Sequence, residues 1–116
     1  MAEMLTNLTR ETVLAENVLR TPHFHDRLIG LLGRASLSPD TTMWIDRCNS
    51  IHTFFMKFPI AAVFVDRDLV VRKIFFNVKP WRLVFPVMGA RSVFEFSTQA
   101  VDSGRVQVGD QLHVGG

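Results

Sequence analysis

The feature that most constrains the fold of this chain is a nearly continuous apolar stretch between Ile51 and Val65. Few polar residues interrupt it, so most of it must be buried on both sides. Pro59 cannot donate a hydrogen bond to a strand ladder, which predicts that a strand begins just after it, at residues 60–65. A polar turn at residues 66–68 precedes a second β-branched and aromatic run at residues 69–76. The two runs predict a hairpin with a short loop.

Shorter patterns predict the elements on either side of this hairpin. Thr21 and Pro22 suit the N-cap and the first position of a helix over residues 22–32, and Gly33 is suited to end it. Further strands are expected at residues 4–9 and 12–20, as an opening hairpin, and at residues 41–45, 91–97, 106–108 and 111–114. The sum is a single domain over residues 1–116 of the α+β class, dominated by strands, with one principal helix at about 22–32.

Composition supports one folded domain. Hydrophobic residues make up 47% of the chain and charged residues 21%, which argues against intrinsic disorder. The longest uninterrupted apolar run, residues 58–65, is too short to span a bilayer. The first residues lack the basic start and apolar core of an export signal, so we expect a cytoplasmic protein as the sequence stands, or an exported one if a leader has been removed. A single cysteine excludes an intramolecular disulfide.

Charge is distributed unevenly along the chain. The net charge of +2 is too small to imply a nucleic-acid partner, and none is expected. Between Lys57 and Arg91, however, there are seven lysines and arginines against two acids. This third of the chain is locally basic, which favours an anionic ligand or partner.

The central stretch also carries a specific motif. Residues 48–56 read Cys-Asn-Ser-Ile-His-Thr-Phe-Phe-Met, followed by Phe-Pro-Ile at 58–60 and Val-Phe-Val-Asp at 63–66. This pattern closely resembles the cysteine and histidine variant of the central motif of the DUF192 family, also called UPF0127. Further matches over roughly residues 20–114 are Arg27, Gly30, Leu31, Leu32, Arg34, Pro80-Trp81-Arg82, Phe94-Glu95-Phe96 and Gly109-Asp110.

The resemblance implies a compact, curled, mostly antiparallel and barrel-like sheet with a helix packed beside it. It implies no activity, because the family is itself defined without one, and its members look both exported and cytoplasmic. Many members carry an aspartate after the Pro-Ile pair, where this chain has Ala61. A role for that acid therefore does not carry over.

Cys48 and His52 are the first candidates for chemistry. On a helix their spacing of four would place them on one face, where an imidazole could activate the thiol as a nucleophile or share a metal ion with it. In a strand the same two residues would lie about 13 Å apart, too far for contact. A free cysteine is commonly an inert buried group. No third ligand of conventional spacing accompanies the pair, so we expect no metal and no cofactor.

Trp81 and Arg82 are the second candidates, in the loop that follows Lys79-Pro80. An indole face and a guanidinium fixed in such a loop could stack on and clamp an anionic or planar ligand. Alternatively, Trp81 caps the mouth of the barrel and Arg82 pairs with an acid such as Glu95. Glu95 itself lies between two phenylalanines, where a carboxylate is either paired or a general base with a raised pKa.

These observations favour a non-catalytic accessory module with a basic, Trp/Arg-lined site that binds a small anionic ligand or a protein segment. The site residues expected are Cys48, His52, Trp81, Arg82 and Glu95. The alternative is a small enzyme that uses Cys48 with His52, or Glu95, in a pocket. A purely structural role in an assembly is the third possibility.

Overall fold

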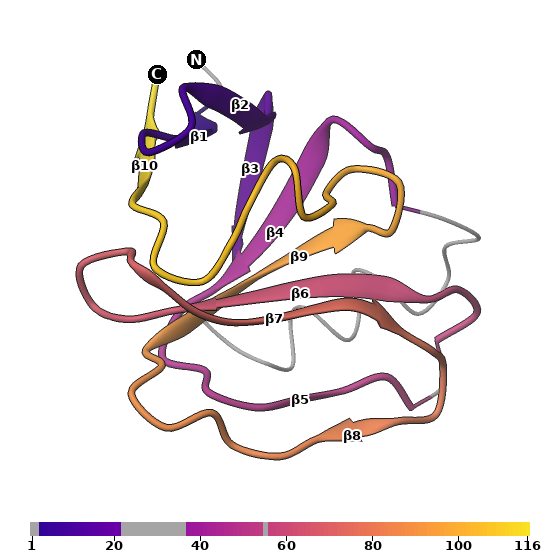
Figure 1. Cartoon of the computed structure of the whole chain (residues 1–116). Helices are drawn as coiled ribbons and strands as arrows, with labels where there is room; N and C mark the ends of the chain where they lie inside the picture. Colours follow the sequence, from indigo (N-terminus) through magenta and orange to yellow (C-terminus); the bar gives the residue numbers. More distant parts are fainter. Residues whose placement is uncertain (1–2, 22–36, 55) are drawn as a thin grey trace.

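The computed structural model describes residues 3–21, 37–54 and 56–116, which form β-strands connected by turns (Figure 1). No helix occurs in these three ranges, and therefore none that could cross a membrane. The strands are β1 (Met4–Asn7), β2 (Thr12–Ala15), β3 (Asn17–Thr21), β4 (Thr41–Ile45), β5 (Ile51–His52), β6 (Ile60–Val65), β7 (Val71–Val78), β8 (Leu83–Val84), β9 (Ser92–Ser97) and β10 (Leu112–Gly115).

A five-stranded sheet in the order β3-β4-β9-β6-β7 forms the middle of the molecule. Its strand β6 is entirely apolar and every residue of it is buried, as the uninterrupted apolar stretch predicts. The predicted hairpin is confirmed: β6 pairs antiparallel with β7. The carboxylate of Asp66 fixes the turn between them by accepting hydrogen bonds from the backbone N–H groups of Asp68 and Val70, at 2.9 and 3.0 Å.

Side chains on the two faces of this sheet enter two separate hydrophobic clusters. Along β9, Phe94 belongs to one cluster and Val93 to the other, as alternation along a strand requires. The first cluster is completed by the sheet β10-β1-β2, and the second by the two-stranded ribbon of β5 and β8, which contributes Ile51 and Val84. The described chain is thus a stack of sheets (Figure 1).

The prediction of an α+β, barrel-like domain with one principal helix is wrong. The expected helix at 22–32 lies outside the described residues, and what is described is all-β. The five-stranded sheet does not close, because β3 and β7 are its two edges. It is a mixed sheet: β3 and β4 run parallel, whereas the other pairs are antiparallel. Both faces of β6 are apolar, and each face is covered by one of the other sheets. The sheets are therefore stacked and do not form a barrel.

The strand predictions are otherwise confirmed in part. The opening hairpin exists as β1 and β2, but the run at 12–20 splits at Glu16, and its second half becomes β3 of the five-stranded sheet. Strands occur near residues 41–45, 91–97 and 111–114 as expected, as β4, β9 and β10. Residues 106–108 form no strand, because the segment bends into a turn in which Asp110 accepts the N–H of Gln107.

Asp110 connects the ends of the chain through a buried carboxylate. Its Oδ2 accepts hydrogen bonds from the side chains of Asn7 at 2.8 Å and Arg10 at 2.7 Å, and from the N–H of Gln107 at 2.9 Å. Burial raises the pKa of Asp110, but these hydrogen bonds outweigh it and hold that pKa below the usual value of 3.8. The ionised form is therefore the one that stabilises the fold.

We expect Asp110→Asn to lower the free energy of unfolding by about 2–3 kcal/mol near neutral pH, because the amide cannot accept all three hydrogen bonds. The stabilisation by the ionised carboxylate is complete above the ordinary pKa of 3.8 and is lost as the pH falls through the lower folded value. Urea denaturation at a series of pH values should show a shallower acid decline for this variant. Exposed Asp68 supplies the control: an effect of Asp68→Asn equal to that of Asp110→Asn would contradict the assignment.

Candidate functional site

Thr53 joins the ribbon of β5 and β8 to the turn at residues 79–82. Its buried hydroxyl donates to the carbonyl of Lys79 at 2.6 Å and accepts the N–H of Arg82 at 2.9 Å. The backbone adds two more hydrogen bonds, from Thr53 N–H to the carbonyl of Arg82 and from Trp81 N–H to the carbonyl of Thr53. This one residue therefore fixes the loop that the sequence singles out as Lys-Pro-Trp-Arg.

The backbone of Trp81 is held in an uncommon conformation. Its φ is +64°, which costs energy for a bulky side chain and persists only where the surroundings enforce it. The indole is 56% exposed and lies 6.1 Å from the ring of Phe54, which in turn stacks at 4.9 Å on His52. Three aromatic rings thus form a row beside the turn, in which Trp81 is the outermost member.

We expect Thr53→Val, a change of nearly equal volume, to lower the free energy of unfolding by about 1–2 kcal/mol, because the carbonyl of Lys79 and the N–H of Arg82, both in part-buried hydrogen bonds, lose the hydroxyl that pairs with them. Chemical denaturation measures this directly. Thr6, half-buried on β1, provides the matched control, and Thr6→Val should stay within about 0.5 kcal/mol of the parent. Equal losses for the two variants would show that the Thr53 hydroxyl does not fix the turn.

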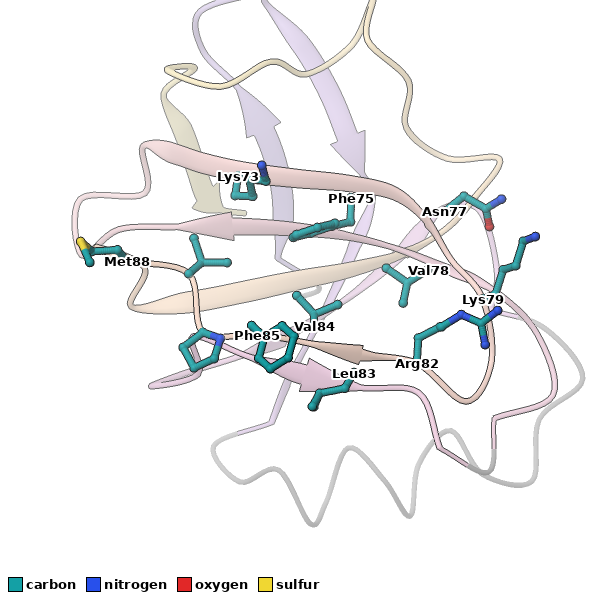
Figure 2. A pocket seen from close by; sticks show the side chains of 12 residues that line it. Lys73, Phe75, Asn77, Val78, Lys79, Arg82, Leu83, Val84, Phe85 and Met88 are labelled. Atoms are coloured by element: carbon teal, nitrogen blue, oxygen red, sulfur yellow. The ribbon is translucent and has the colours of Figure 1, made fainter.

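A groove of about 760 Å³ runs between β7 and the segment that begins with β8 (Figure 2). Figure 2 shows β7 carrying Lys73, Phe75 and Asn77 along one wall, with Lys79 and Arg82 at one end and Met88 at the other. We call it the basic groove, and its described lining consists of Lys73, Phe75, Asn77, Val78, Lys79, Arg82, Leu83, Val84, Phe85, Pro86, Val87 and Met88.

The charges in the basic groove all have one sign. Lys73, Lys79 and Arg82 are exposed, and the described lining contains no aspartate or glutamate. The Arg82 guanidinium lies near the carbonyl of Pro80, at 3.4 Å, and Lys73 lies over the ring of Phe75, 5.6 Å from its centroid. A concave surface with this charge pattern concentrates anions from solution.

The wall opposite β7 exposes large apolar side chains. Leu83 is 55% exposed, Phe85 76% and Met88 96%. Two other lining residues of this segment, Val84 and Val87, pack against the second cluster. An exposed apolar wall beside a row of cations is typical of a binding surface rather than of an inert one.

The structure places Cys48 and His52 around a smaller hollow of about 320 Å³. Its other described lining residues are Arg47, Asn49, Ser50, Ile51 and Leu83. The Cys48 thiol donates a hydrogen bond to the carbonyl of Ser50 at 2.8 Å, a contact that a thiolate cannot make. Leu83 lines both this hollow and the basic groove, so the two sites adjoin across β8.

Glu95 lies apart from both sites. It is fully buried in β9, paired in register with Met43 on β4 and Ala62 on β6, and it lines neither the groove nor the hollow. Arg82 is exposed at the end of the groove. The suggestion that Trp81 caps a barrel mouth is wrong, because the sheet has no closed barrel.

The five residues expected from the sequence therefore fall into three groups: Cys48 with His52, Trp81 with Arg82 at the turn, and Glu95 in the sheet. The groove residues outside the predicted five include Lys73, Lys79, Phe75 and the apolar wall. Only the position of Pro86, which prevents a long strand after Leu83, signals that this apolar run could remain at the surface. Among the described residues, no group of three or more His, Cys, Asp or Glu could hold a metal ion.

Comparison with known proteins agrees with this architecture. A protein of unknown function from Novosphingobium aromaticivorans DSM 12444 has a similar crystal structure, with a TM-score of 0.74, 20% identity and coverage of 97% of this chain and 84% of that one. A second crystal structure, described as that of a candidate transcription regulator from Sinorhizobium meliloti 1021, gives a TM-score of 0.72, 23% identity and coverage of 97% and 91%. At these identities the likeness concerns the fold alone. No curated protein sequence matches significantly.

The family comparison covers nearly the whole sequence. The model of DUF192, described as "Uncharacterized ACR, COG1430", matches residues 7–114. This range contains both the central motif and the two strand edges that form the basic groove. The family assignment drawn from the motif is confirmed, and the chain belongs to the DUF192 family, whose function is unknown.

Proposed function

We propose that this protein is a non-catalytic binding module that holds an anionic ligand in the basic groove. The observation that carries the proposal is the sign of the groove's charges: Lys73, Lys79 and Arg82 line it without an acid in its described lining. Some other cations of the described chain have an acidic partner, as Arg20 has Glu3 and Arg72 has Asp66. The lining of the groove contains no such acid, so its positive charge is not compensated within the lining.

The residue types suit a carboxylate or a phosphate. The Arg82 guanidinium can form two parallel hydrogen bonds to either group, and the two lysines act as point charges that need no fixed geometry. Thr53 sets the position of the Arg82 backbone, so part of the ordering cost of the site is met before a ligand arrives. The apolar wall adds contact area for a ligand that is only partly charged.

A catalytic role for Cys48 and His52 is the second candidate, supported by their place around one hollow. The hydrogen bond from the thiol to Ser50 favours the unreactive protonated form, and we therefore rank it below binding. The rate at which iodoacetamide alkylates Cys48, measured over a range of pH, distinguishes the catalytic role from the binding role. Fast alkylation at neutral pH that disappears in His52→Ala would favour the enzyme, and alkylation no faster than that of a simple thiol would remove this version of it.

Calorimetric titration with citrate, pyrophosphate, ADP, short polyglutamate and a short DNA duplex tests the proposal. We expect at least one carboxylate or phosphate compound to bind, with an affinity that falls as salt is raised, because ion pairs in an open groove are screened. Binding to the DNA duplex alone would instead support the kind of role named for the Sinorhizobium meliloti relative. No binding by any of the five compounds would contradict the proposal.

A further inference from the structure

We infer that the ligand of the basic groove is an extended segment of a partner protein, bound as an additional strand along β7, with acidic and apolar side chains facing the groove. The inference rests on the proposed function and names the chemistry of its occupant. It is based on the open edge of β7 and on the arrangement of charges and apolar groups along the groove. It is also based on the repulsion that a second copy of this chain, with the same positive groove, would meet.

The outer edge of β7 is available for strand pairing. β6 pairs with its inner side, and β7 is the last strand of the five-stranded sheet. Residues 69–71 already pair on this side with residues 109–112, and Val71 exchanges hydrogen bonds with Asp110 and Gly109 at 2.9 and 2.8 Å. In the part of the chain that the structure describes, no strand continues this pairing along residues 73–77. An incoming strand could therefore extend an edge that the protein already uses for pairing.

Part of the groove wall repeats with the period of a strand. Lys73, Phe75 and Asn77 line it at every second residue of β7 (Figure 2), and Val78 follows directly after Asn77, where the pairing of β7 with β6 shifts register. Groove-facing side chains of an added strand would follow the same spacing of about 6.6–6.8 Å. The stretch of β7 that lines the groove, residues 73–78, corresponds to about six residues of extended chain at about 3.3 Å per residue. This is the shape of a peptide rather than of a compact small molecule.

The chemistry of the two walls defines the occupant further. Acidic side chains of the ligand would pair with Lys73, Lys79 and Arg82. Apolar side chains of the ligand would contact Leu83, Phe85 and Met88, which are 55%, 76% and 96% exposed. In the complementary strand, every second side chain faces the groove, and these groove-facing side chains include both acidic and large apolar ones. A second copy of this chain docking through the same groove would oppose cations to cations, so a different, acidic partner is the better fit.

A displayed library of random twelve-residue peptides tests the inference. Peptides selected on the wild-type protein should be enriched in acids interleaved with apolar residues at every second position. The selected peptide, once synthesised, should bind Lys73→Glu/Arg82→Glu at least about tenfold more weakly, and should bind Lys57→Glu, which carries an exposed charge outside the groove lining, within about twofold of wild type.

Backbone pairing is tested on the same peptide by N-methylating alternate amides. One alternate set would face β7, and its methylation should weaken binding at least about tenfold, while methylation of the other set should have little effect. Leu83→Ala should weaken binding whereas Leu8→Ala should not, because Leu8, 52% exposed, lies outside the groove lining.

The outcomes separate this inference from the proposed function. If citrate or pyrophosphate binds in the groove but no selected peptide depends on its charges, the inference fails and the proposed function stands. Equal effects of methylating the two amide sets would also overturn strand addition. If neither anions nor peptides bind, both are wrong.

Discussion

Replacing Phe94 with alanine should lower the free energy of unfolding by about 3–5 kcal/mol. The side chain is fully buried on β9, in the centre of the five-stranded sheet, and its ring stacks on Trp44 with centroids 5.0 Å apart. Truncation removes these contacts and leaves a cavity that the surrounding strands can fill only partly. Urea denaturation, analysed as a two-state transition, gives the value.

Phe85 supplies a matched control for this change. It is 76% exposed in the wall of the basic groove, so Phe85→Ala should alter the free energy of unfolding by less than about 0.5 kcal/mol. The two variants therefore separate stability from the proposed binding role. If both lowered stability equally, the groove wall would be part of the core and the assignment of an exposed binding surface would be wrong.

The double variant Lys73→Glu/Arg82→Glu should lose anion binding by at least about thirtyfold, because two of the three cations in the groove lining are replaced by charges that repel the ligand. Both side chains are exposed, so the free energy of unfolding should change by no more than about 0.5 kcal/mol. Calorimetry with the strongest ligand of the wild-type protein measures the loss.

The control is Lys57→Glu/Arg67→Glu, which makes the same change in net charge at two exposed residues outside the groove lining. It should retain most of the affinity, since long-range electrostatics alone are screened within about 8–10 Å at moderate salt. Equal losses in the two double variants would mean that the protein attracts anions by overall charge and that the groove is not the site.

Several parts of the fold can be predicted from local pattern. The apolar stretch after Pro59 predicts β6 and its pairing with β7, and the structure confirms burial on both faces of β6. The central motif around Cys48 and His52 predicts the family. These predictions succeed because they depend on neighbouring residues. The α+β, barrel-like prediction is wrong because the choice between a closed sheet and stacked sheets depends on which distant strands meet.

The candidate site is predicted less well, for the same reason. The excess of cations between Lys57 and Arg91 is visible in the sequence, but the pattern does not indicate that Lys73 and Arg82 line one groove while Lys57 lies elsewhere. Nor does the pattern indicate that Leu83, Phe85 and Met88 form one exposed apolar wall. The positive φ of Trp81 depends on hydrogen bonds to Thr53, which is distant in the sequence.

The most direct test of the proposed function is a map of amide chemical shifts in isotopically labelled protein titrated with pyrophosphate and, separately, with citrate. We predict saturable shifts at the residues that line the basic groove, with the largest at Lys73, Lys79, Arg82 and Leu83. Shifts centred instead on the hollow of Cys48 and His52, or spread evenly over the exposed cations, would contradict the assignment of the binding site to the groove between β7 and β8.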